Sequence, residues 1–561
     1  MNIRGKSMVF LATALLMTLL LIPACDGDES TPSPFVTPTP GDNKSTPTPF
    51  VTPTPVGNKS TPTPLLTPTS GGHDPTDSDI VLSQPNVVLI VADDLGWNDV
   101  GYHGGAEFET PNIDRLVQEG VEFDRFYATP ICTPTRAALL TGRDALRFGT
   151  AYSTIMPWDN FGLPPQEHLM PESFQQAGYQ TAMIGKWHLG HTIRAHHPNE
   201  RGFDYFWGHL NTTVSYFTHE VLAGGYDMQL NGESVYAEGE YATYLANEQT
   251  VNWLQNRDKT RPFFLYVPYL APHSPLEAPE ELLSKYSYIE DENRRTYVAM
   301  VDALDQGVGQ ILDTLDTEGI ADNTIVLFFS DNGGTQYFSG DNTPLRGYKM
   351  DAFEGATRVA AGLRWPDRIE GGTKLSQVIS VMDMFPTLTA MAGIEPQNDK
   401  PFDGMNVQRS IENGEVFERD DYLFFIADEP TPGTTRVSVM HQDWKLVQII
   451  DHLQTTATVE NYLFNLKEDP TEQTNLADEH PEMVDDFAAR IKEWRSQHPI
   501  AGVHTHVVPH PGWRAPYDYA EAMAAYDGLI DEETEVHFMG NHDLLEFVDM
   551  TYGEKGKATY K

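Results

Sequence analysis

Continuous apolar runs that end in polar residues constrain the fold of this chain more than any other feature. Residues 86–91, NVVLIV, form one such run, and the chain continues as ADDLG. Residues 324–329, TIVLFF, form another, which continues as SDNGG. A segment that is apolar along its whole length is typical of a strand in a parallel sheet whose two faces are both covered by helices. The two runs therefore predict buried strands of such a sheet.

Two further runs and two amphipathic segments extend this pattern. Residues 263–267 precede His273, and the shorter run 181–184 precedes the segment GKWH. Residues 111–119 and 293–317 place apolar side chains at helical spacing. Alternating strands and helices predict an α/β fold with a large, mainly parallel sheet flanked by helices. Ligands bind at the carboxyl ends of such strands, so we expect the polar residues after the runs to share one site.

The pattern changes after residue 415. Short strand-like segments with close turns predict a small antiparallel sheet, and residues 480–494 predict a helix. The strand-like segments are 421–426, 436–440, 443–450 and 462–466. We therefore expect a large domain over residues 85–415 and a smaller C-terminal α+β domain over residues 416–500. Residues 501–561 form an acidic, aromatic-rich C-terminal extension to which the sequence assigns no role.

The N-terminus has the features of an export signal. Arg4 and Lys6 precede an apolar run over residues 8–21, which is too short for a comfortable membrane span. The cysteine at the expected cleavage point resembles a bacterial lipobox. Residues 1–24 are therefore predicted to be a lipoprotein signal peptide, with Cys25 as the lipidated residue. An ordinary signal peptide with a chance cysteine is the alternative.

Residues 25–84 are predicted to form a disordered tether. A 15-residue unit rich in Pro and Thr repeats three times, beginning at Ser30, Ser45 and Ser60. Prolines at this density prevent helices and strand ladders and favour extended conformations that bury no core. We expect an exported protein whose lipid anchor holds it on a bacterial membrane, on the periplasmic or cell-surface side, with the tether as a spacer.

The net charge excludes one class of partner. The chain has 81 acidic residues against 37 Lys and Arg, which gives a formal net charge of -44. No basic stripe is available to neutralise phosphates, so we expect no nucleic-acid partner. An anionic substrate is repelled at long range, and its site must be made locally positive by a few placed cations.

Oxygen ligands follow two of the predicted strands. Asp93 and Asp94 follow the first run, and Asp331 and Asn332 follow the second. Such oxygens suit calcium or magnesium rather than zinc, and adjacent carboxylates repel one another strongly without a cation. Turn and capping chemistry is the better explanation of one such pair alone, but the second pair favours a metal site.

Cys132 opens the most distinctive segment of the chain, CTPTRAALLTGR. Pro134 suits the first turn of a helix, which puts Cys132 at a helix N-terminus, where free N–H groups and the helix dipole favour an anion. Arg136 adds positive charge nearby. The chain has two cysteines, and with Cys25 assigned to the lipid anchor, Cys132 has no partner for an intramolecular disulfide.

This segment resembles the signature of the formylglycine-dependent sulfatases. The resemblance extends from residue 85 to about residue 494, and segments 201–204 and 344–355 look most like the arylsulfatase B-like branch of the alkaline phosphatase superfamily. It implies an alkaline-phosphatase-like fold, and a separate maturation enzyme that oxidises Cys132 to formylglycine (3-oxoalanine). It also implies one Ca²⁺, whose ligands are Asp93, Asp94, Cys132, Asp331 and Asn332.

The same resemblance assigns the remaining site residues. The segment GKWHLG matches the one that supplies a lysine and a histidine near the formylglycine. The segments APHSPL and PLRGYK match those that supply a sulfate-binding histidine and a sulfate-binding lysine. The catalytic residues implied are Cys132, Arg136, Lys186, His188, His273 and Lys349. In this scheme His273 or Lys349 protonates the leaving alcohol, and His188 takes the proton from the remaining hydroxyl of the hydrate.

The resemblance implies an arylsulfatase-type sulfuric ester hydrolase, whose substrate is a sulfated small molecule or, as suits an exported acidic enzyme, a sulfated polysaccharide. One alternative is a phosphate or phosphonate monoester hydrolase of the same superfamily. Another is a tethered, non-catalytic binder of sulfated glycans. The cysteine signature speaks against the first alternative, and the full set of catalytic matches against the second. Specificity is expected in the divergent segments 191–199 and 217–238 and around 510–517.

Overall fold

The computed structural model describes residues 84–104, 107–428, 433–452, 457–499, 509 and 513–526, which belong to one compact unit, residues 80–561. The predicted signal peptide, Cys25 and the three repeats lie outside the described residues, as do residues 501–508, 510–512 and 527–561 of the extension. None of the helices within the described ranges has both the length and the apolar character needed to cross a membrane.

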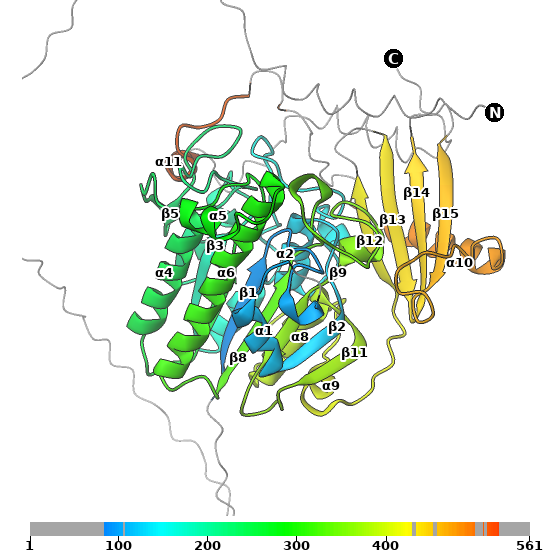
Figure 1. Cartoon of the computed structure of the whole chain (residues 1–561), viewed down its shortest axis with the longest axis horizontal. Coiled ribbons are helices and arrows are strands. Elements are labelled where there is room, and N and C mark those ends of the chain that lie inside the picture. The colour runs from blue at the N-terminus through cyan, green and yellow to red at the C-terminus, as the bar shows by residue number, and fades with distance from the viewer. Residues whose placement is uncertain are drawn as a thin grey trace, which may run out of the picture. The chain divides into compact units, whose positions relative to one another are not determined.

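A large sheet runs through this unit (Figure 1). Its strand order is β11-β2-β10-β8-β1-β7-β3-β4-β5-β6, and β9 pairs with β2. The strands are β1 (Asn86–Ala92), β2 (Val121–Tyr127), β3 (Gln180–Lys186), β4 (Tyr205–His209), β5 (Gln229–Leu230), β6 (Glu233–Ser234), β7 (Phe263–Pro268), β8 (Thr324–Ser330), β9 (Arg358–Val359), β10 (Ala361–Arg364) and β11 (Thr373–Ser380).

The middle of this sheet is parallel, as the apolar runs predict. β1 pairs in parallel with β7 on one side and β8 on the other, with Val87 opposite Phe264 and Ile325. β3 joins β7 in parallel and β4 joins β3, whereas β10 runs antiparallel to both β8 and β2. Every residue of β7 and β8 is buried. Burial on both faces explains why these strands are apolar throughout.

Helices cover both faces of the large sheet. Val88 and Ile90 of β1 pack in one core with residues of α1, α4, α5 and α6, while Val87 and Leu89 pack in a second core with α2, α3, α8 and α9. Figure 1 shows α4 and α6 side by side on the first face. The helices are α1 (Pro111–Gln118), α2 (Cys132–Thr141), α3 (Met170–Gln176), α4 (Ala242–Asn256), α5 (Glu280–Lys285), α6 (Glu292–Thr317), α7 (Glu354–Thr357), α8 (Met384–Met391) and α9 (Gln408–Asn413). α1 and α6 confirm the two helices that were predicted from periodicity.

A second, antiparallel sheet has the order β12-β13-β14-β15. α10 (Pro481–Arg495) packs against β13 and β14, and Trp494 stacks on Phe424 with ring centroids 4.8 Å apart. The strands are β12 (Leu423–Asp428), β13 (Thr434–His441), β14 (Trp444–Asp451) and β15 (Thr458–Asn465). The predicted fold, a mainly parallel α/β sheet with an additional antiparallel sheet, is therefore confirmed. The domain limits at residues 415 and 500 stay predictions.

A buried charged cluster connects the second sheet to the segment that carries Lys349. Lys445 Nζ, on β14, lies 2.8 Å from Glu354 Oε1 of α7 and 3.2 Å from Glu472 Oε1, and all three side chains are fully buried. Glu354 also accepts a hydrogen bond from the hydroxyl of Tyr127, at 2.8 Å, and its main-chain N–H donates to the Glu472 carboxylate at 2.7 Å. The cluster therefore fixes α7, which begins a few residues after Lys349.

The described part of the C-terminal extension lies beside β5 and β6 (Figure 1). It ends in α11 (Tyr519–Tyr526), which contacts β6. The buried carboxylate of Asp518 accepts hydrogen bonds from Ser234 Oγ at 2.7 Å and from the Tyr236 hydroxyl at 3.1 Å. The extension is thus attached to the large sheet at the edge opposite β11.

Candidate active site

The four predicted oxygen ligands come together at the carboxyl ends of β1 and β8. Asp93 and Asp94 follow β1, and Asp331 and Asn332 follow β8, its parallel neighbour. Asp94 N donates to Asp331 Oδ1 at 3.3 Å, and Asn332 Nδ2 donates to Asp94 Oδ1 at 2.7 Å. All four side chains are buried. Parallel pairing causes this grouping, because adjacent parallel strands end at the same edge of the sheet.

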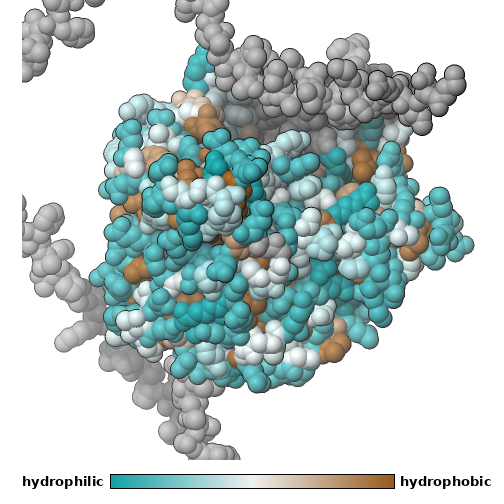
Figure 2. Space-filling view, in the orientation of Figure 1, coloured by the Kyte–Doolittle hydropathy of each residue, from teal (hydrophilic) through white to brown (hydrophobic). Residues whose placement is uncertain are grey.

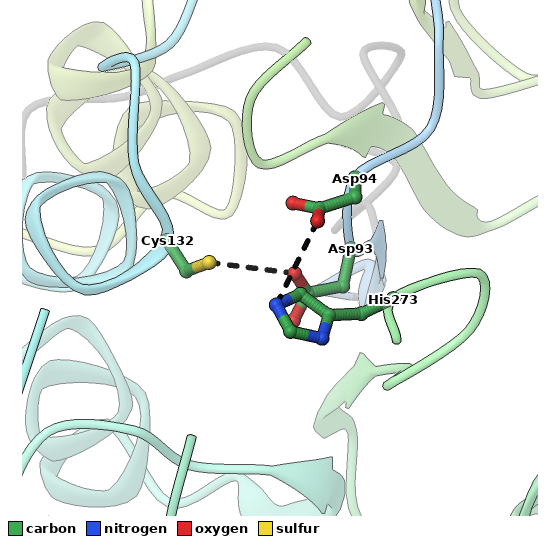
Figure 3. Close-up of side chains that lie close together, drawn as sticks. All are labelled: Asp93, Asp94, Cys132 and His273. Atoms are coloured by element: carbon green, nitrogen blue, oxygen red, sulfur yellow. Dashed lines mark hydrogen bonds and ion pairs between the residues drawn. The ribbon is translucent and has the colours of Figure 1, made fainter. Parts of the chain in front are cut away.

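Cys132 is the first residue of α2, and its side chain points toward Asp93 (Figure 3). Its Sγ lies 3.4 Å from Asp93 Oδ1. The preceding residue, Ile131, is extended, so the helix begins at the cysteine and its dipole favours negative charge there. Asp93, Asp94, Cys132 and His273 each offer one ligand atom, and these atoms lie within 4.8 Å of one another. A histidine expected to bind sulfate therefore adjoins the predicted metal ligands.

Two buried cations on neighbouring elements neutralise the carboxylates. Arg136 Nη2, on α2, lies 2.9 Å from Asp93 Oδ2 and 2.8 Å from Asp331 Oδ2. Lys186 Nζ, at the end of β3, lies 2.5 Å from Asp93 Oδ2. Arg136 Nη1 also donates to the carbonyl of Lys186 at 2.9 Å. Although the chain as a whole is strongly acidic, these two cationic side chains lie where an anion is expected to bind.

Lys349 supplies a third cation. Its Nζ lies 2.6 Å from Asp94 Oδ1 and 3.2 Å from Cys132 Sγ. The next residue, Met350, donates its N–H to the carbonyl of Pro130 at 2.9 Å, which ties this loop to the start of α2. Although burial opposes the charge, Asp94 and Cys132 hold the pKa of Lys349 well above its ordinary value. The side chain is therefore an ammonium group beside the cysteine.

Each of the two predicted histidines has one ring nitrogen fixed by a carbonyl. His188 Nε2 donates to Ile155 O at 3.1 Å, and its Nδ1 has no hydrogen-bond partner among the described residues. His273 Nδ1 donates to Ser274 O at 2.6 Å, and its Nε2 lies 3.6 Å from Asp94 Oδ2. Because a carbonyl only accepts, the bonded nitrogen carries the proton, and the other nitrogen of each neutral ring is able to accept one.

The pKa values of both rings support the neutral forms. Burial lowers the pKa of His273 to about 4. Burial, together with Lys186, lowers the pKa of His188 well below its ordinary value. Both rings are therefore neutral near pH 7 in the protein as described.

The oxygen ligands fit a divalent cation such as Ca²⁺. Burial and the charge of Asp93 raise the pKa of Asp331 to about 7, which reflects the repulsion within the group. Asn332 Oδ1 is buried and, within the part of the chain that the structure describes, has no hydrogen-bond partner. Leaving such an atom unsatisfied costs about 1–3 kcal/mol. A bound cation satisfies this oxygen and offsets the repulsion, and hard oxygens suit Ca²⁺ or Mg²⁺.

Two polar residues at the end of β4 were not predicted from the sequence. His209 ends this strand opposite Lys186 of β3, and Asn211 follows. His209 Nε2 and Asn211 Oδ1 are buried and lack hydrogen-bond partners among the residues described. Their position beside Lys186 makes them candidates to bond polar groups of a substrate. The signal was another strand that ends in polar residues, but Gly208 shortens the apolar run and hides it.

Comparisons with known proteins agree with this geometry. Residues 85–394 match the family model described as Sulfatase, and residues 349–497 match the one described as N-sulphoglucosamine sulphohydrolase, C-terminal. The chain is 33% identical to Arylsulfatase J of Mus musculus over 454 residues, which are 73% of this chain and 76% of that protein. It is also 33% identical to N-acetylgalactosamine-6-sulfatase of Homo sapiens over 365 residues, 61% of this chain and 68% of that protein.

A solved structure is similar over most of the folded unit. The crystal structure of Ps i-CgsB in complex with k-i-k-neocarrahexaose matches with a TM-score of 0.69 and 29% identity, and covers 80% of this chain and 98% of that one. The Sulfatase match spans more than half of the chain and contains both carboxylate-bearing strand ends and Cys132. This chain belongs to the sulfatase family and is a sulfuric ester hydrolase.

Proposed function

We propose that this sulfatase removes sulfate from carbohydrates, with a formylglycine made from Cys132 as its nucleophile and one Ca²⁺ in its site. The observation that carries the proposal is the position of Cys132, at the first residue of α2, with Asp93 on one side and the Lys349 ammonium on the other. Two relatives support the carbohydrate assignment: one is named an N-acetylgalactosamine-6-sulfatase, and one was solved with neocarrahexaose bound.

The chemistry of Cys132 supports its modification. Burial and Asp93 raise the pKa of this thiol above its ordinary value. A neutral thiol is a poor nucleophile. Its carbon also carries no hydroxyl whose deprotonation could later drive the release of sulfate. Formylglycine, as its hydrate, would supply two hydroxyls on one carbon, one to attack sulfur and the other to give up its proton as sulfate leaves.

The calcium ion would be held by residue 132 and by the oxygens of Asp93, Asp94, Asp331 and Asn332. When bound, Ca²⁺ supplies positive charge that stabilises sulfate oxygens and an ionised nucleophile. Arg136, Lys186 and Lys349 balance the charges of Asp93, Asp94 and Asp331, so that a bound Ca²⁺ would make the site locally positive. The cations and the ion together would then offset the long-range repulsion between an acidic protein and an anionic ester.

The remaining side chains move protons and bind the sulfate group. Lys349 lies against residue 132 as an ammonium, so it can bind a sulfate oxygen or protonate the leaving alcohol. His273 Nε2 points into the same group of ligand atoms, and it can serve either purpose once it has taken up a proton, which a bound sulfate anion favours. His188 Nδ1 carries a lone pair and can accept the proton that the remaining hydroxyl gives up.

Export, lipidation of Cys25 and maturation by a separate oxidising enzyme are parts of the same proposal. They rest on the sequence of residues 1–84 and on the signature at Cys132. Mass spectrometry of the protein from a bacterial host that matures sulfatases tests them together. A lipidated N-terminal Cys25 is expected in the membrane fraction, and Cys25→Ala is expected to release the protein from that fraction.

Two measurements test the proposed chemistry. The peptide that contains Cys132 is expected to show an aldehyde in place of the thiol, and sulfate release is expected to scale with the fraction modified. The matured enzyme is then compared on sulfate and phosphate monoesters of the same alcohol. Faster turnover of the phosphate ester would replace this proposal with a phosphate or phosphonate ester hydrolase, whereas full activity with unmodified Cys132 would exclude formylglycine.

A further inference from the structure

A tight turn over residues 155–159 lies at the edge of the candidate active site. Ile155 N donates to Thr133 Oγ1 at 3.2 Å, and Ile155 O accepts from His188 Nε2 at 3.1 Å. Thr133 directly follows Cys132 in α2. The turn is therefore joined by hydrogen bonds to the segment that carries the nucleophile and to the histidine beside it.

Trp158 is held within this turn. Met156 N donates to the Asp159 carboxylate at 2.7 Å, and Asp159 N donates to Met156 O at 2.9 Å. The carbonyl of Pro157 accepts a hydrogen bond from His191 Nε2 at 3.1 Å. The Trp158 side chain itself is half-buried and is absent from the hydrophobic cores formed by the described residues.

The C-terminal extension brings a second tryptophan to the same place. Trp513 lies edge-on to Trp158, with ring centroids 5.9 Å apart and an interplanar angle of 78°. Trp513 is also half-buried and lies outside the same cores. Its segment is anchored nearby through Asp518 and through Tyr519, whose ring contacts that of His191 at 5.8 Å. Trp158 and Trp513 therefore bring the turn beside the candidate active site into contact with the C-terminal extension.

Some of the other exposed apolar side chains lie on the C-terminal extension or beside it. The face shown in Figure 2 is mostly hydrophilic, with apolar residues in small separate groups. Few large apolar side chains are exposed among the described residues, and three of them, Leu222 (67%), Tyr236 (64%) and Tyr517 (86%), lie on the extension or on the loop beneath it. Asn160 and Arg514, both exposed, adjoin the tryptophans in sequence on the same two segments. An apolar surface with polar neighbours beside a catalytic site is typical of a ligand subsite.

We propose that Trp158 and Trp513 form a subsite for a sugar ring next to the sulfated one, so that the substrate is a sulfated oligosaccharide or polysaccharide. The inference rests on the proposed action on carbohydrate and extends it from a single sugar to a chain. The C–H face of a sugar ring packs on an aromatic ring much as apolar groups do, and two rings at a steep angle contact two sides of the ligand. The subsite takes no part in the chemistry at residue 132.

The test compares substrates that differ only in what lies beyond the sulfated sugar. Matured, full-length Trp158→Ala and Trp513→Ala enzymes are assayed on an aryl sulfate, a sulfated monosaccharide and longer sulfated oligosaccharides. We expect each variant to lower kcat/KM on the oligosaccharides about tenfold, mainly through KM, because one aromatic contact of this kind is lost. The aryl ester and the monosaccharide are expected to change by less than about twofold.

Two control variants separate the subsite from an effect on folding. Trp444→Ala removes a half-buried tryptophan from β14, away from the tryptophan pair. This variant is expected to change kcat/KM by the same factor on all the substrates. Trp513→Tyr keeps an aromatic ring and is expected to retain most of the activity on oligosaccharides. Equal losses on aryl and oligosaccharide substrates in Trp158→Ala and Trp513→Ala would overturn the subsite in favour of a structural role.

Failure of the subsite is distinguishable from failure of the proposed function. Wild-type enzyme that cleaves sulfated oligosaccharides, with variants that cleave them equally well, would refute the subsite alone. Wild-type enzyme that cleaves the aryl ester but no sulfated carbohydrate would refute the carbohydrate assignment and the subsite with it. A preference of the wild-type enzyme for longer chains that both tryptophan variants lose would support the proposal.

Discussion

Replacing Lys445 with methionine tests whether the buried charged cluster stabilises the joint between the second sheet and α7. The substitution keeps most of the side-chain volume and removes the ammonium that lies 2.8 Å from Glu354 and 3.2 Å from Glu472. Among the described residues, Glu472 then remains buried without a cation, and Glu354 keeps only Arg358, whose Nη1 lies 3.9 Å from Glu354 Oε2. Breaking a buried ion pair by removing one partner costs about 3–5 kcal/mol, and we expect a loss of this size in the free energy of unfolding at pH 8.

The loss is expected to depend on pH. Burial raises the pKa of Glu472 to about 7, whereas an exposed glutamate titrates near pKa ~4.3. The folded protein therefore binds this proton more tightly than the unfolded chain, so the stabilisation is present below the unfolded pKa and is lost as the pH rises to about 7. Without Lys445 the effect of burial is opposed only by the hydrogen bond from the main-chain N–H of Glu354. The variant should therefore fall further below wild type at pH 8 than at pH 5.

Urea unfolding at the two pH values measures both effects. Lys374→Met is the matched control, because Lys374 contacts Glu122 at 2.8 Å and Asp124 at 3.0 Å but its side chain is 51% exposed. Such a surface pair contributes about 0–1 kcal/mol. If Lys445→Met costs less than about 1 kcal/mol, or costs the same at pH 5 and pH 8, the charged cluster does not stabilise the joint in the way described.

Three further predictions concern the site itself. Cys132→Ala should lower sulfate release at least about 10³-fold with an unchanged circular dichroism spectrum, because the nucleophile is lost; residual activity near wild type would exclude this residue. Chelation with EGTA should lower both activity and the midpoint of thermal unfolding, and added Ca²⁺ should restore both, since Asp93, Asp94 and Asp331 repel one another without a cation; an unchanged midpoint would contradict a calcium site. Lys349→Ala should lower kcat about 10²-fold with less change in KM, because its ammonium meets charge that develops in the transition state; an effect on KM alone would limit Lys349 to substrate binding.

The centre of the fold was predictable because its strands are buried on both faces. Residues 87–91 and 325–329 are apolar without interruption, and they lie in β1 and β8 at the middle of the sheet. β2 has alternating burial instead, and β5, β6 and β9 are very short, so the local sequence carries little signal for them. These strands depend on their neighbours in the sheet rather than on their own composition.

The candidate site was predictable to the extent that its residues directly follow apolar strands or belong to a recognisable motif. Asp93 and Asp331 are of the first kind, and Lys349 is of the second. Trp158 and Trp513 are of neither kind, since each lies in an irregular segment with no periodicity. Their meeting depends on contacts between distant parts of the chain, such as the hydrogen bonds of Asp518 to Ser234 and Tyr236. Local sequence patterns do not encode such contacts.

The attachment of the C-terminal extension has a consequence for the order in which this enzyme is completed. Asp518 forms an isolated bridge with Tyr226, so the end of the described chain returns to a loop from its first half. Ribosomes make the chain from its N-terminus, and the residues around Cys132 are therefore available to fold long before Trp513 exists. If the tryptophans select the substrate as proposed, the growing protein acquires its selectivity after its catalytic residues. Substitutions around Trp513 would then change which substrates are cleaved and leave the chemistry at residue 132 unchanged.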